Sequence, residues 1–190
     1  MSILQTTARM VPRSAATSTT GGAIAGLDIP QQHNAVWCWC AVTLGLRNFY
    51  ERVSPPLQQC DVANAVLNIN SACTHPMDPQ AFRLLALERA LRRFGLMLGN
   101  PIEQPLSMLQ IAQQIDMGRP IATRLEFSLG AGHFVVIYGY RSAGISPTVL
   151  VEDPRTGLQR DMPLSKFAGS FDGPSRWTHS YLTKPTGVPT

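Results

Sequence analysis

The sequence has little charge and lacks any long apolar run. Only 15% of its 190 residues are charged, whereas 44% are hydrophobic. This balance excludes disorder over the whole length and predicts one sizeable hydrophobic core. The apolar runs are far shorter than the ~20 residues that a membrane-spanning helix needs, so we expect no membrane span.

Cysteine is scarce and does not have the spacing of a metal site. No two of Cys38, Cys40, Cys60 and Cys73 form a Cys-x-x-Cys pair, so the usual zinc motifs are excluded and no metal or cofactor is expected. Four cysteines are also too few for a fold built on disulfides. Two alternatives stay open for Cys60 and Cys73, namely a disulfide outside a reducing cytosol or two free buried thiols.

Clustered basic charge is also missing. The net charge is +4, but the basic residues are dispersed, and no run interleaves them with aromatics. The densest group comprises Arg83, Arg89, Arg92 and Arg93, which fall on one predicted helix together with Glu88. We interpret this group as a solvated helix face and expect no nucleic-acid partner.

Residues 1–26 lack acidic residues and apolar periodicity but are rich in Ser and Thr. They do not show the charged start and apolar core of a Sec signal peptide. We therefore expect a disordered leader over 1–26, which is either a floppy terminus or a segment read by a secretion machine or import receptor. A folded domain over 27–185 and a tail over 186–190 complete the expected organisation.

The hydrophobic period changes near residue 119, from helical to alternating. Helices are predicted over 37–52, 57–67, 78–94 and 105–117, and strands over 120–127, 133–138, 148–152, 157–161 and 177–182. Helices followed by an antiparallel sheet are typical of the α+β class.

Three residues with chemically useful side chains fall at element boundaries. Cys38 opens the first predicted helix, where the N–H groups and the dipole favour a thiolate. His133 opens a strand after a glycine, and Asp153 ends the next strand. Each has an ordinary interpretation alone: a small buried hydrophobe, a half-buried histidine and an Asp-Pro turn. Together they predict a nucleophilic thiol, a general base and a carboxylate that orients the base.

The surrounding residues resemble the papain-like cysteine peptidases. Gln32, five intervening residues and Cys38-Trp39 are similar to the papain signature, in which a Gln precedes the nucleophilic Cys-Trp. Trp37-Cys-Trp-Cys-Ala41, Gly132-His133 and Asp153-Pro154 resemble the compact bacterial branch of this clan. That branch includes avirulence-type effector proteases of plant pathogens and bacteriocin-leader peptidases. The resemblance spans residues 29–182, although Cys40 stands where that branch usually has alanine.

The resemblance implies a papain-like fold, with the helical part packed on a C-terminal antiparallel sheet and a cleft between them. It implies that Cys38 is the nucleophile, His133 the base and Asp153 the orienting group of a peptidase that forms an acyl-enzyme. The Gln32 side-chain amide and the Cys38 N–H would bind the oxyanion. Further candidates for the substrate cleft are Trp37, Trp39 and Gly132. For the two tryptophans the alternative is packing of the helix, which we expect for at least one of them.

The expected substrate is a protein or peptide, and a secretion machine, a chaperone or an inhibitor is an expected partner. Secretion by a non-Sec route is the expected localisation, with the cytoplasm as the alternative. The same residues also suit glutamine deamidation or acyl transfer, and a catalytically silent binding module of the same fold is a further alternative. A redox or metal site at Cys38-x-Cys40 is disfavoured, because helix residues two apart point to different sides.

Overall fold

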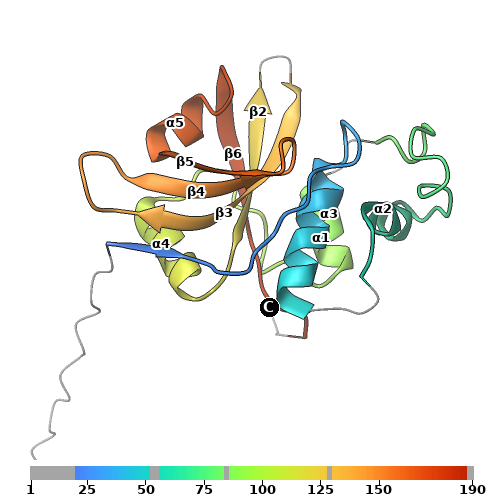
Figure 1. Cartoon of the computed structure of the whole chain (residues 1–190), viewed down its shortest axis with the longest axis horizontal. Helices are drawn as coiled ribbons and strands as arrows, with labels where there is room; N and C mark the ends of the chain where they lie inside the picture. Colours follow the sequence, from blue (N-terminus) through green and yellow to red (C-terminus); the bar gives the residue numbers. More distant parts are fainter. Residues whose placement is uncertain (1–19, 52–55, 84–85, 128–129, 188–190) are drawn as a thin grey trace, which may run out of the picture.

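The computed structural model describes residues 20–51, 56–83, 86–127 and 130–187, which form five helices and a six-stranded sheet (Figure 1). The elements, in chain order, are β1 (Gly21–Ala23), α1 (Cys38–Glu51), α2 (Gln59–Leu67), α3 (Leu87–Arg93), α4 (Met108–Asp116), β2 (Ile121–Phe127), β3 (Gly132–Arg141), β4 (Thr148–Asp153), β5 (Leu158–Pro163), α5 (Leu164–Gly169) and β6 (Ser175–Leu182).

The sheet is antiparallel throughout, and its strands follow the order β5-β4-β3-β2-β6. The short strand β1 pairs with the last residues of β3, beyond the point where β2 begins. These helices and this sheet confirm the predicted α+β class.

Helices cover both faces of the sheet, so the central strand β3 is buried on both sides. Phe134 and Val136 face the core formed with α1, α2 and α3, whereas Val135 and Ile137 face the core under α4 and α5. This double burial explains why β3 is apolar at consecutive positions instead of alternating. Figure 1 shows α1, α2 and α3 gathered on one side of the sheet.

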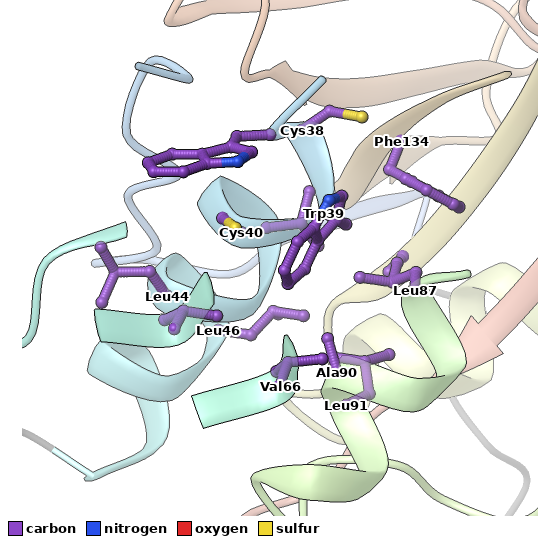
Figure 2. Packing of buried hydrophobic residues seen from close by; sticks show 14 of the residues in the cluster. Cys38, Trp39, Cys40, Leu44, Leu46, Val66, Leu87, Ala90, Leu91 and Phe134 are labelled. Atoms are coloured by element: carbon purple, nitrogen blue, oxygen red, sulfur yellow. The ribbon is translucent and has the colours of Figure 1, made fainter. Parts of the chain in front are cut away.

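The first nine residues of α1, from Cys38 to Leu46, are all buried. Figure 2 shows why: Trp39 and Leu46 lie toward Leu87 and Leu91 of α3, and Phe134 of β3 lies beside the start of the helix. The helix therefore begins inside the protein, and its first residue is held by packing on several sides.

The expected boundary of the leader is wrong, because residues 20–26 belong to the folded part. β1 pairs Gly21 with Arg141, and the N–H of Ile24 donates to the Tyr138 carbonyl at 2.8 Å. A Cβ on Gly21 would stand only 2.9 Å from the Tyr140 carbonyl oxygen, so the pairing depends on glycine. Residues 1–19 of the expected leader lie outside the described residues, as do 188–190 of the expected tail.

The helix predicted over 78–94 is also wrong in its first half. Asp78 forms a turn, in which its Oδ1 accepts from the Gln80 N–H at 2.8 Å, and α3 begins only at Leu87. The Ala81 carbonyl accepts from the Trp37 indole and the Arg83 N–H, and the Arg83 carbonyl accepts from the Trp39 indole, so among the described residues neither makes the bond expected inside an α-helix. Residues 84–85 and 52, also placed in predicted helices, lie outside the described residues. Helix α5, between β5 and β6, was not predicted.

Candidate active site

A turn at Asn34 leads directly into the start of α1. The Asn34 side-chain oxygen accepts from the Val36 N–H at 3.1 Å, and its carbonyl accepts from the Trp37 N–H at 3.2 Å. The Trp37 carbonyl then accepts the first helical bond, from the Ala41 N–H. Cys38 is thus the first residue of α1, where backbone N–H groups have no partner within the helix.

The Cys38 thiol is buried and lies beside the start of β3. Burial raises the pKa of this thiol, and the backbone N–H groups of Phe134 and Trp39, together with the charge of Arg155, offset only part of the rise. Phe134 follows His133 in the chain, so the thiol reaches the strand that carries the histidine. A thiol with a raised pKa needs a base close by to become a nucleophile.

Cys40 does not share this environment. Figure 2 shows the Cys38 sulfur on the side of α1 that faces Phe134, whereas the Cys40 sulfur lies on the opposite side of the helix. Burial, and to a smaller extent Cys38, raise the pKa of Cys40 far above its ordinary range. Cys40 is therefore a buried core residue whose thiol resists ionisation, and its side chain points away from that of Cys38, as expected for two helix positions separated by about 200°.

His133 and Asp153 meet because β3 and β4 are antiparallel neighbours, so that the start of β3 and the end of β4 lie at the same edge of the sheet. His133 Nε2 lies 2.7 Å from Asp153 Oδ1, and both side chains are buried. With Nε2–H donated to the carboxylate, Nδ1 is the nitrogen left to accept a thiol proton.

The carboxyl group of Asp153 is held in its charged form. Burial by itself raises its pKa, but the hydrogen bond and charge of His133 and the backbone N–H of Arg155 outweigh burial, so the pKa is lowered. The Arg155 N–H lies 2.9 Å from Oδ1, the same oxygen that accepts from His133. An ionised carboxylate in this position fixes the imidazole ring and stabilises its protonated form.

Gln32 connects the two halves of the site. Its backbone N–H donates to the Pro154 carbonyl at 2.7 Å, and its side-chain Nε2 donates to the Asn34 carbonyl at 2.8 Å. An amide nitrogen carries two hydrogens, so one N–H remains after the bond to Asn34. The Gln32 Oε1 atom is buried and has no hydrogen-bond partner among the described residues. The side chain thus lies in the approach to α1, as the sequence predicted.

The tryptophans beside Cys38 both pack in the core, which was the alternative expected for at least one of them, and neither walls an open cleft. Trp37 is 1% exposed and Trp39 is 0% exposed. Their indole N–H groups donate to the Ala81 and Arg83 carbonyls, each at 3.0 Å. Both side chains therefore anchor the start of α1 to the segment before α3.

A cavity of about 520 Å³ opens near the start of β3, although none of Cys38, His133 and Asp153 lines it. It is lined by Ala86, Arg124, Gly130, Gly132, Phe134, His179 and Tyr181. A Cβ on Gly132 would stand 3.2 Å from Arg124 Nε, so glycine lets the guanidinium lie close to the strand. Of the three predicted cleft residues, only Gly132 borders this space.

Cys60 and Cys73 are joined in a disulfide, which settles the two alternatives left open by the sequence. The bond links α2 to the loop whose Pro76 carbonyl accepts from Asn34 Nδ2 at 3.4 Å. Among the described residues, Cys60, Asp61 and Cys73 are the one group close enough to share a metal ion, and two of its ligand atoms are the bonded sulfurs.

Sequence reasoning missed two arginines near the site. Arg155 lies within electrostatic reach of both Cys38 and Asp153, and its guanidinium stacks on the Phe127 ring at 5.2 Å. Its place directly after Asp153-Pro154 was a usable signal. Arg160 lies 3.6 Å from Asp153 Oδ2, and only the register of β4 and β5 brings them together.

Comparisons with known proteins identify the family of this chain. The family model described as papain-like cysteine protease AvrRpt2 matches residues 23–172. No curated protein matches the sequence. The helices in the described part of the chain include none with the length and apolar character needed to cross a bilayer. Since the family model covers most of the chain, including Cys38, His133 and Asp153, this protein belongs to the AvrRpt2 family of papain-like cysteine proteases.

Proposed function

We propose that this cysteine protease is an endopeptidase that cuts protein substrates with Cys38, His133 and Asp153 as its triad. The observation that carries the proposal is the 2.7 Å contact between the buried His133 Nε2 and Asp153 Oδ1, beside a thiol at the start of α1. In this proposal Cys38 is the nucleophile, His133 the base and Asp153 the carboxylate that orients the base.

The first half of the reaction forms an acyl-enzyme. His133 Nδ1 takes the Cys38 proton, and the thiolate attacks the carbonyl carbon of the scissile bond. The new S–C bond moves the carbonyl electrons onto oxygen, where the Cys38 N–H and the Gln32 amide can donate. The C–N bond then breaks, and the leaving amine takes the proton from His133.

The second half releases the product. His133 takes a proton from water, the hydroxide attacks the thioester, and the S–C bond breaks to give a carboxylic acid. Cys38 recovers its proton from His133. The ionised Asp153 stabilises the protonated imidazole at both stages, since its pKa is lowered in this site.

The disulfide and the family support a proposal about where this activity operates. A Cys60–Cys73 bond fits a protein that works outside a reducing cytosol, which favours secretion by a non-Sec route over a cytoplasmic location. A bacterial effector role accords with the motifs that the chain shares with avirulence-type proteases. A secretion machine, a chaperone or an inhibitor is then an expected partner.

The test is proteome-wide mapping of new protein termini after incubation with wild type or Cys38→Ala. New termini made by wild type alone support the endopeptidase. Glutamine-to-glutamate conversion or amine incorporation without new termini would support a deamidase or acyltransferase instead. A Cys38 that reacts with a thiol-directed probe no faster than free cysteine would favour a silent binding module.

A further inference from the structure

The two carboxylate oxygens of Asp153 have different surroundings. Oδ1 accepts from His133 Nε2 at 2.7 Å and from the Arg155 N–H at 2.9 Å. Oδ2 is buried and has no hydrogen-bond partner among the described residues. A buried charge that lacks a partner on one side is costly unless another charge compensates for it.

Arg160 on β5 supplies that charge from the far side of the carboxylate. Its Nη1 lies 3.6 Å from Asp153 Oδ2, which is too long for a hydrogen bond but close enough for an ion pair. The two residues are diagonal neighbours across β4 and β5, because Arg160 pairs with Val151 in the register.

Arg160 is itself held in place by two further contacts. Its Nη1 and Nη2 donate to the two carboxylate oxygens of Asp172 at 3.0 and 2.8 Å, in the paired geometry that suits arginine. Its guanidinium also lies 4.7 Å from the centre of the buried Phe171 ring. The Arg160 guanidinium is therefore held in a defined position by Asp172 and Phe171.

We propose that Arg160 is a positioning residue of the triad, which keeps Asp153 ionised and directed at His133. This inference rests on the proposed function of Cys38, His133 and Asp153. The charged or titratable groups that act on Asp153 are His133 from β3, Arg155 from the following turn and Arg160 from β5. Asp172, Arg160 and Asp153 thus form a row of alternating charge that runs from the surface to His133.

Removing the Arg160 guanidinium leaves the Asp153 carboxylate without the positive charge next to its Oδ2 atom. Asp153 then takes up a proton at a higher pH, and a protonated Asp153 no longer stabilises the imidazolium. Arg160→Gln should lower kcat/KM by about tenfold, as outer partners of functional groups commonly contribute. The acidic limb of its pH profile should move up by about one pH unit.

The matched control is Arg141→Gln. Arg141 also forms an ion pair between strands, with Asp161 at 2.6 Å, but both side chains are about half exposed and neither contacts the triad. The control should keep the kcat/KM and the pH profile of wild type. Arg160→Lys should recover part of the loss, because it restores the charge without the two-pronged bond to Asp172.

The rate of Cys38 alkylation by iodoacetamide across pH gives a readout that needs no peptide substrate. A wild-type rate no faster than that of free cysteine would overturn the proposed function. A reactive wild type with an unshifted profile in Arg160→Gln would overturn the positioning role alone. If Arg160→Gln does not fold, Arg160→Met, which also removes the charge, replaces it: a profile shifted to higher pH supports the proposal, and an unchanged profile overturns it.

Discussion

The backbone N–H of Gln32 donates to the carbonyl of Pro154 at 2.7 Å. This bond ties the segment before α1 to the turn that follows Asp153. A second bond, from the Ile29 N–H to the buried Glu152 Oε2 at 2.6 Å, joins the same two segments. The start of the helix that carries the thiol is therefore fixed to the end of the strand that carries the carboxylate, although the two are far apart in the sequence.

Cys38→Ser and His133→Ala should each abolish turnover while the protein stays folded. Cys40→Ala should keep most of the activity, because the Cys40 sulfur lies on the opposite side of α1. Steady-state kinetics on a cleaved peptide and circular dichroism of each variant check this. Loss of activity in a folded Cys40→Ala would mean that the nucleophile is assigned to the wrong thiol.

Gln32→Ala should lower kcat strongly and leave KM nearly unchanged. Loss of one oxyanion donor typically costs about a hundredfold to a thousandfold in kcat. Gln31→Ala is the control, because the Gln31 side chain is exposed and donates only to the Arg155 carbonyl at 3.3 Å. Equal kinetics of the two variants would show that Gln32 is an ordinary loop residue.

Trp37→Phe should destabilise the protein. The change removes the hydrogen bond from the indole N–H to the Ala81 carbonyl, which then keeps only the Arg83 N–H, and such a bond contributes about 0.5–1.5 kcal/mol. Urea unfolding followed by circular dichroism measures the free energy of unfolding. Ile145→Ala, at a fully exposed position, should stay within about 0.5 kcal/mol of wild type. An unchanged unfolding free energy in Trp37→Phe would contradict the anchoring role.

The stability that Asp153 contributes should depend on pH. Its pKa is lower in the folded protein than in the unfolded chain, where it is about 3.9. The contribution is therefore complete above the unfolded value and is lost as the pH falls through the folded value. Unfolding of wild type and Asp153→Asn across pH should show a difference that is largest near neutrality and shrinks in acid. A difference independent of pH would contradict this.

Two truncated chains should separate the role of β1 from that of residues 1–19. A chain that begins at Thr20 keeps β1 and should retain the stability of wild type. A chain that begins at Leu27 loses the pairing with β3, in which each hydrogen bond contributes about 0.5–1.5 kcal/mol. Thermal unfolding compares them, and equal midpoints would show that β1 adds nothing.

The sequence alone was sufficient for the fold class and for the residues that make up the proposed site. Helical periods before residue 119 and alternating or continuous apolar runs after it are local signals. Cys38, His133 and Asp153 each fall at an element boundary, and each boundary is readable from nearby residues. The false helix at Asp78 shows the limit of such signals. An N-cap residue followed by proline occurs both at the start of a helix and in a single turn, so the local sequence does not distinguish the two. In the structure the indoles of Trp37 and Trp39 donate to the carbonyls of Ala81 and Arg83, and the segment forms a turn.

Only the tertiary structure decided which atoms meet. The antiparallel pairing of β3 and β4 sets His133 Nε2 against Asp153 Oδ1, and the register of β4 and β5 adds Arg160. Tertiary packing also buries Trp37 and Trp39, and it pairs β1 with β3 at Gly21. These outcomes depend on contacts between residues distant in the chain, where local sequence preference carries no information about the partner.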